Sequence, residues 1–221
     1  MEKRTSDIVK LINKLKRKYQ AKRRVKNYDF MSGLVFELFR TNRPVTKAVK
    51  AVDSICRKYV DWNEFRVTPL KVIQHDLSMS NDDLRFLAQL KRAIQGIFET
   101  QSTFANEHYD EMGALDCVDI LKEAGIDAEI AAVVVATYLD KAVMPLPDEI
   151  LRIIKRLGIF PSKSSRRRVR SYFMKMGEEG LIDMYQTYRL LLHHAETACF
   201  IKEPDCRSCF LPGRDCRSAR S

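Results

Sequence analysis

The chain has 221 residues, enough to bury a sizeable core as one large domain or two small ones. Its 39 Lys and Arg residues outnumber its 29 Asp and Glu residues, and the net charge of +10 favours a polyanionic partner, nucleic acid ahead of an anionic membrane surface. The longest apolar run is too short to span a bilayer and no signal peptide precedes the first charged segment. We therefore expect a cytoplasmic protein that does not enter a membrane, nucleoid-associated if its source is bacterial.

The charge is unevenly distributed along the chain. Residues 1–28 carry a net charge of +9, residues 29–145 carry −5, and residues 146–221 carry +6. Two basic ends that flank an acidic middle suggest that the ends fold together as one phosphate-facing module. The pattern predicts a domain of residues 29–145 and a second domain of residues 1–28 plus 146–221.

In chain order, the segments predict helices throughout. Gly (8) and Pro (7) are scarce and no stretch alternates with the period of a strand, so the fold class is all-α. A basic amphipathic helix over residues 6–24 has an apolar stripe, and helices follow over residues 29–40, from Pro44, over a short part of 61–76, and over 80–99. The stripe consists of Ile8, Leu11, Ile12, Leu15 and Tyr19.

Two single cysteines and the only tryptophan have structural interpretations. Cys56 and Cys117 lie in helical patterns, where a buried thiol is expected. Trp62 lies among Asn63, Glu64 and Arg66 and is expected to be a half-buried anchor, with stacking on a flipped base as the alternative.

Four further cysteines, Cys199, Cys206, Cys209 and Cys216, lie within eighteen residues near the end of the chain. In a reducing compartment such clustering indicates metal ligands rather than disulfides. Structural zinc sites usually combine two short knuckles, and this segment has only one CxxC. Six-residue arms on both sides of that CxxC can wrap a bulky iron–sulfur cluster, so the spacing favours a cluster over zinc.

The run ETACFIKEPDCRSCFLPGRDC resembles the C-terminal [4Fe-4S] loop of the endonuclease III family of DNA glycosylases, within the helix-hairpin-helix superfamily. Its last arm, residues 210–215, is one residue longer than is usual there. The resemblance implies a two-lobe fold with a six-helix barrel domain and an iron–sulfur domain, and a [4Fe-4S] cofactor on the four cysteines. It also implies that the cluster is a scaffold for a DNA-facing loop, where Arg207 and Arg214 would contact phosphates.

The same resemblance predicts a helix-hairpin-helix upstream. The segment ALDCVDILKEAGIDAEIAAVVVATYL fits, with one helix to Glu123, a turn over residues 124–127 and a second helix from Ala128. Such a turn presents backbone N–H groups to a DNA phosphate. Gly125 and Ile126 match the Gly-apolar-Gly turn, whereas Asp127 replaces its second glycine.

The catalytic positions of the family are altered. Glu129 stands where bifunctional members carry the lysine that attacks the sugar, and Pro147 stands where the catalytic aspartate is expected, with Asp148 one residue further. The base-inserting loop has only Thr41 and Asn42. One interpretation is a DNA-binding protein without activity; the other is a monofunctional glycosylase that uses Asp148. An RNA-binding or redox-sensing cluster protein is a third class.

The densest cationic stretch, SKSSRRRVR, is predicted to be a phosphate-contacting loop that leads into a helix containing Tyr172, Phe173 and Met176. It covers residues 162–170 and contains Lys163, Arg166, Arg167, Arg168 and Arg170. We therefore predict a monomeric iron–sulfur protein that binds irregular double-stranded DNA (bulged, branched, bent or damaged) with steep salt dependence and acts in DNA repair or maintenance.

Overall fold

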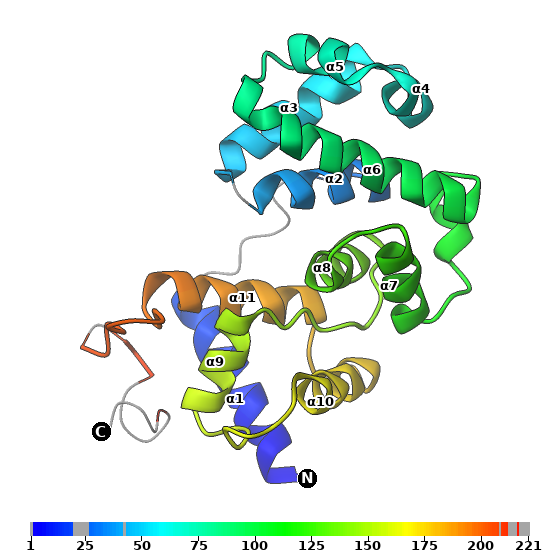
Figure 1. Cartoon of the computed structure of the whole chain (residues 1–221). Coiled ribbons are helices and arrows are strands. Elements are labelled where there is room, and N and C mark those ends of the chain that lie inside the picture. The colour runs from blue at the N-terminus through cyan, green and yellow to red at the C-terminus, as the bar shows by residue number, and fades with distance from the viewer. Residues whose placement is uncertain (1, 20–26, 42, 208, 212–215, 217–221) are drawn as a thin grey trace. The chain divides into compact units, whose positions relative to one another are not determined.

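The computed structural model describes residues 2–19, 27–41, 43–207, 209–211 and 216, and it divides the chain into two compact units. Unit 1 comprises residues 1–25 and 142–221, and unit 2 comprises residues 26–141. Every regular element in the described residues is a helix, which confirms the all-α prediction (Figure 1). None of these helices is long and apolar enough to cross a membrane.

Unit 2 is built around a helix with almost no exposed surface. Unit 2 contains α2 (Phe30–Arg40), α3 (Val45–Lys58), α4 (Trp62–Val67), α5 (Leu70–Asp76), α6 (Leu84–Gln101), α7 (Ala114–Glu123) and α8 (Ala128–Tyr138), with short 3-10 turns at Asn81–Asp83 and Asn106–Tyr109. The nearly unexposed helix is α8. Residues 131–137 of α8 are all buried, and α8 packs on α2 and α7.

Glycine allows two of the close approaches in unit 2. A Cβ built on Gly33 would lie 2.5 Å from the ring of Tyr138, so α2 can approach α8 this closely only without a side chain there. Gly96 of α6 faces the backbone of Ala124, the first residue after α7, in the same way. The hairpin turn is therefore seated directly on α6.

Unit 1 joins the first helix of the chain to the last three. It contains α1 (Glu2–Tyr19), α9 (Asp148–Arg156), α10 (Arg166–Glu178) and α11 (Met184–Thr197), and α11 packs on both α1 and α9 (Figure 1). The predicted stripe of α1 is buried, since Ile8, Leu11, Ile12 and Leu15 are at most 7% exposed. Burial of this apolar face is the main force that holds the basic α1 in place.

Two predictions about local structure are wrong. The cationic stretch is not a loop throughout, because α10 begins at Arg166 after Ser165 accepts a hydrogen bond from the Arg168 N–H at 3.3 Å. Cys56 is exposed rather than buried, because the inward face of α3 is taken by Ala48, Val52 and Ile55. Cys117 is buried as expected.

Candidate functional site

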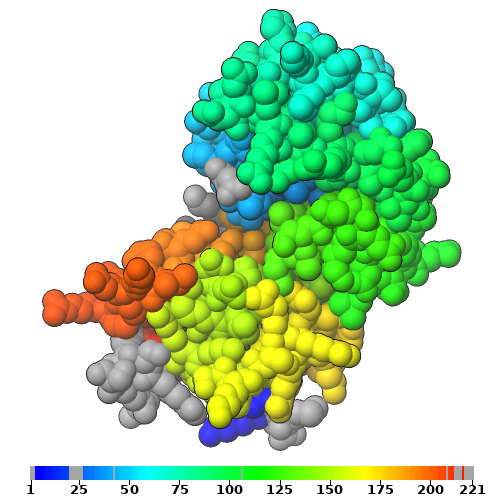
Figure 2. All heavy atoms as spheres, viewed as in Figure 1, coloured from blue at the N-terminus to red at the C-terminus, as the bar shows by residue number. Residues whose placement is uncertain are grey.

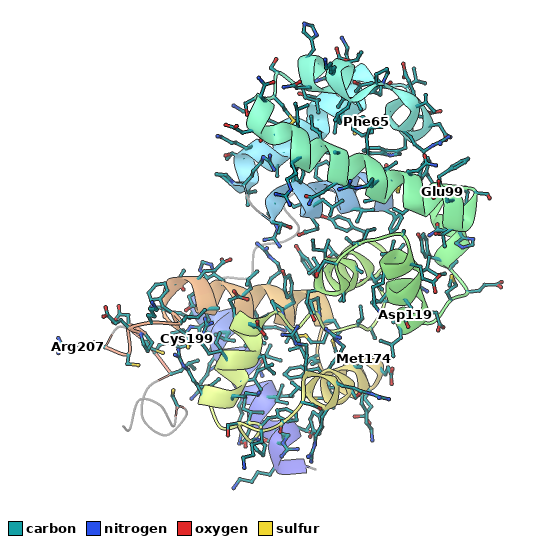
Figure 3. All side chains as sticks on the ribbon, in the orientation of Figure 1. Phe65, Glu99, Asp119, Met174, Cys199 and Arg207 are labelled. Carbon is teal, nitrogen blue, oxygen red and sulfur yellow. The ribbon has the colours of Figure 1, made fainter. Side chains whose placement is uncertain are left out.

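The four clustered cysteines surround one cavity in unit 1. Cys199, Cys206, Cys209 and Cys216 all line one pocket that is partly open to solvent. The remaining lining comes from α9, α11 and the loop after it and is mostly apolar: Ile153, Leu157, Ala198, Pro204 and Leu211, with Arg156 and His194. Figure 3 shows Cys199 at the start of the loop that follows α11. Residues that are distant in sequence therefore converge at this cavity.

Two arginines of α9 hold the first arm of the cysteine loop. Arg156 donates from Nη1 to the sulfur of Cys199 at 3.3 Å and to the carbonyl of Phe200 at 2.7 Å, and from Nη2 to the carbonyl of Ile201 at 3.1 Å. Arg152 donates to the carbonyl of Cys199 at 2.9 Å. Hydrogen bonds from a charged donor are roughly twice as strong as neutral ones, so these contacts place the loop as well as its sulfur.

A buried histidine approaches a second sulfur. His194 is 2% exposed, and its Nε2 lies 3.8 Å from the sulfur of Cys209 while its Nδ1 lies 2.7 Å from the hydroxyl of Tyr19. Burial, with a smaller contribution from His193, lowers the pKa of His194 to about 4, so the ring is neutral at pH 7. If the Tyr19 hydroxyl donates to Nδ1, the Nε2–H is directed at the sulfur of Cys209.

The thiols of this cavity influence each other electrostatically. Burial raises the pKa of the Cys209 thiol, and the charges of Cys216, Cys199 and Cys206 raise it further, against a hydrogen bond from the backbone N–H of Leu211 at 3.4 Å. Four thiolates can therefore share this apolar cavity only if cationic charge is supplied to them.

The four cysteines are soft thiol donors of the kind that zinc and iron–sulfur clusters both take. Tetrahedral zinc with Zn–S bonds of about 2.3 Å brings its sulfurs to within about 4 Å of each other. Among the described residues, no three His, Cys, Asp or Glu side chains are close enough to hold a metal ion. Four cysteine donors, with N–H groups directed at two of their sulfurs, are features that iron–sulfur sites also have. The cluster itself stays a prediction.

The predicted phosphate-binding arginines lie at the start of α10. Arg167 and Arg168 are exposed, Arg166 and Arg170 are half-buried, and Lys163 is exposed just before the helix. In Figure 2 the yellow segment that contains α10 lies at the surface of unit 1. Cations at a helix N-terminus oppose the helix dipole, which costs stability. Arg166 has a structural partner in Asp148, and Arg170 donates from Nε to the carbonyl of Met144 at 3.1 Å. Arg167 and Arg168 are the exposed arginines of this stretch.

The other predicted cations lie on the cysteine loop. Arg207 is exposed and points away from the helices of unit 1 (Figure 3). Arg214 lies outside the described residues.

The helix-hairpin-helix of unit 2 forms with the predicted boundaries. Gly125 has a φ of +84°, which a residue with a side chain rarely adopts, and the N–H of Ile126 donates to the carbonyl of Leu121 at 3.0 Å. Ile126 is 4% exposed, so its side chain anchors the turn. The carboxylate of Asp127 accepts hydrogen bonds from the N–H groups of Glu129 at 2.8 Å and Ile130 at 3.3 Å.

The candidate catalytic carboxylate is already in an ion pair. Asp148 is the first residue of α9, after Pro147 at the N-cap position, and its side chain is 80% exposed. Its Oδ1 is bonded to Nη2 of Arg166. The guanidinium thus engages one of the two oxygens of the exposed carboxylate. Thr41 is exposed at the end of α2, and Asn42 lies outside the described residues.

Trp62 lies partly exposed at the start of α4 and meets the ring of Phe65 edge-on at 6.1 Å. This packing is that of the half-buried anchor.

Several residues at the cysteine cavity were not predicted. Arg152, Arg156 and Tyr19 come from α9 and α1, which the cysteine spacing does not involve, and His194 was not assigned a role. The only signal for the arginines is their spacing of four residues, which places them on one face of a helix.

Comparison with solved structures identifies the fold. A complex of endonuclease III covalently trapped on DNA aligns over 98% of this chain and 97% of its own, with a TM-score of 0.73 and 16% identity. A thermostable thymine-DNA glycosylase aligns over 99% and 98%, with a TM-score of 0.72 and 15% identity. A 3-methyladenine DNA glycosylase from H. pylori aligns over 86% and 97%, with a TM-score of 0.62 and 16% identity.

No protein-family profile matches the sequence, and no curated protein matches it. The solved structures show that the fold is that of the helix-hairpin-helix DNA glycosylases, as the cysteine loop and the hairpin predicted. Among these, the endonuclease III-like structures share it over nearly the whole chain.

Proposed function

We propose that this protein is an iron–sulfur DNA-binding protein of DNA repair or maintenance that binds irregular double-stranded DNA and does not excise bases. The observation that carries this proposal is the separation of charge on a DNA-glycosylase fold. Unit 1 has 25 Lys and Arg against 11 Asp and Glu, a net charge of +14, whereas unit 2 has 14 against 18, a net charge of −4. The arginines at the start of α10 belong to the strongly basic unit.

The absence of base excision is inferred from three positions. Glu129 cannot form a Schiff base, Pro147 has no carboxylate, and Asp148 is bonded to Arg166. Preference for irregular DNA is inferred because a duplex that is bulged, branched or damaged costs less energy to bend than an intact one. In this function the [4Fe-4S] group on the four cysteines would supply no chemistry to DNA and would hold the loop that contains Arg207.

The binding test measures the affinity of the purified protein for intact, bulged and branched duplexes over a range of salt concentrations. We expect tighter binding to the irregular duplexes and a steep linear fall of log K with log salt. The double variant Arg167→Gln/Arg168→Gln should reduce the slope by up to about 1.8, which is about 0.9 per lost phosphate contact. The control Lys47→Gln/Lys50→Gln removes the same charge from exposed positions of α3 in unit 2 and should leave the slope nearly unchanged.

The second candidate function is a monofunctional DNA glycosylase that uses Asp148, since this exposed carboxylate lies one residue after the expected position. Duplexes with uracil, oxidised pyrimidines, alkylated purines or mismatches would then release a base, and Asp148→Asn would abolish the release. Base release by the wild-type protein would overturn the proposed lack of activity. Release that persists in Asp148→Asn would show that another group is responsible.

A further inference from the structure

The hairpin of unit 2 has the backbone shape of a phosphate-binding turn. Gly125 supplies the left-handed conformation between α7 and α8, and a Cβ built there would meet nothing within 4 Å. The first N–H groups of α8 follow directly, and N–H groups at a helix start attract anions when nothing else accepts from them. Availability of those N–H groups therefore decides whether the turn can bind DNA.

In this chain two of these N–H groups already donate to an acceptor within the chain. Oδ1 of Asp127 receives both the Glu129 N–H at 2.8 Å and the Ile130 N–H at 3.3 Å. This carboxylate oxygen thus already accepts from the two N–H groups that a phosphate oxygen would have to engage at this helix start. A phosphate could enter only after Asp127 had left, and it would meet a negative charge beside it.

The acidic side chains around the turn also disfavour a bound phosphate. Residues 114–130 contain five acidic side chains, Asp116, Asp119, Glu123, Asp127 and Glu129, against Lys122 alone. Asp119 on α7 is labelled in Figure 3, where it lies in the same helical pair. Its carboxylate also accepts from Lys122 at 2.7 Å, so the single cation of the segment is itself neutralised.

We infer that Asp127 closes the hairpin to DNA phosphate, so that this chain keeps the helix-hairpin-helix as a structural element while its contacts with DNA come from unit 1. Asp127 is thus a residue that determines specificity: it removes one fixed phosphate contact from the binding surface. The inference deepens the proposed function and rests on it for the role of DNA.

The test compares three variants of the full chain. Asp127→Gly removes the carboxylate, and the hairpin should still fold because glycine is itself an accepted N-cap residue. Asp127→Asn removes the charge but keeps an oxygen that can accept from the same N–H groups. Glu123→Gln removes one charge from an exposed position of the same hairpin and is the matched control.

In duplex binding, Asp127→Gly should gain one phosphate contact, and its salt slope should steepen by about 0.9. Its affinity relative to wild type should accordingly be about three- to fourfold higher at 50 mM than at 200 mM salt. The slopes of Asp127→Asn and Glu123→Gln should equal that of wild type. Equal slopes for all three variants would overturn the inference, because only net charge would then matter.

A second measurement does not depend on DNA. Titration with inorganic phosphate, followed by the amide resonances of Glu129 and Ile130, should shift these resonances in Asp127→Gly and leave them in place in the wild-type protein. Equal shifts in both proteins, or none in Asp127→Gly, would overturn the inference. Failure of the wild-type protein to bind any duplex would instead contradict the proposed function, and the phosphate titration would still decide the role of Asp127.

Discussion

Gly96 makes the position of the hairpin directly testable. A Cβ at this residue would lie 2.9 Å from both the Cα and the carbonyl carbon of Ala124, and closer still to its carbonyl oxygen. These atoms belong to the backbone of the hairpin turn, so they cannot rotate away as a side chain could. Gly96→Ala should therefore force α6 and the turn apart.

The size of the effect follows from two opposing contributions. Alanine in place of glycine inside a helix stabilises it by about 1 kcal/mol, and overpacking costs about 1–3 kcal/mol. Because the clash is with backbone, we take the upper end, so the net loss for Gly96→Ala is about 2 kcal/mol. For a chain of this length that loss lowers Tm by about 4–8 °C.

Gly177→Ala is the matched control for this experiment. Gly177 also lies in a helix, α10, but a Cβ there meets the side chain of Met184, whose flexible end can move aside. Thermal unfolding followed by circular dichroism should show Gly96→Ala clearly below wild type and Gly177→Ala at or slightly above it. The reasoning is refuted if Gly96→Ala melts at the wild-type temperature or higher.

Three further predictions concern the cluster loop, the hairpin and the acid stability of unit 2. Arg156→Gln loses the hydrogen bonds to Cys199, Phe200 and Ile201, so this variant should lose iron to a chelator faster than Lys155→Gln, a control on the same helix. The loss is measured from the cluster absorbance, and equal rates in the two variants would contradict this role for the arginine. Gly125→Ala should cost about 1 kcal/mol in urea unfolding because of the φ of +84° alone, since the added Cβ contacts nothing; an unchanged stability would show that the turn adopts another conformation. Hydrogen bonds from Arg43 and Ser80 hold the pKa of Asp83 below its ordinary value. The ionised carboxylate therefore stabilises the fold above about pH 4, and this contribution is lost as the pH falls through the lowered pKa. Asp83→Asn should flatten the dependence of stability on pH in that range, and an unchanged acid transition would exclude the contribution.

The sequence alone determined the features that depend on a few neighbouring residues. The apolar stripe of α1, the ends of α7 and α8, and the left-handed glycine at position 125 all follow from helical periodicity and from local backbone preferences. The resemblance carried by the cysteine loop and the hairpin predicted the fold of the whole chain, which the structural comparisons show. The sequence prediction missed the N-cap at Ser165, whose hydroxyl accepts from the Arg168 N–H, so that a helix begins within the run of arginines that was predicted to be a loop.

Only the tertiary structure decided which distant side chains surround the candidate site. Arg156 and Cys199 are 43 residues apart, Tyr19 and His194 are 175 apart, and Arg166 and Asp148 are 18 apart. These contacts depend on the packing of α9 and α1 against α11 and on the course of the loop before α10, which no short-range pattern specifies. For the same reason the cysteines could be selected by their spacing, whereas the groups that donate to their sulfurs and the ion pair of Asp148 could not.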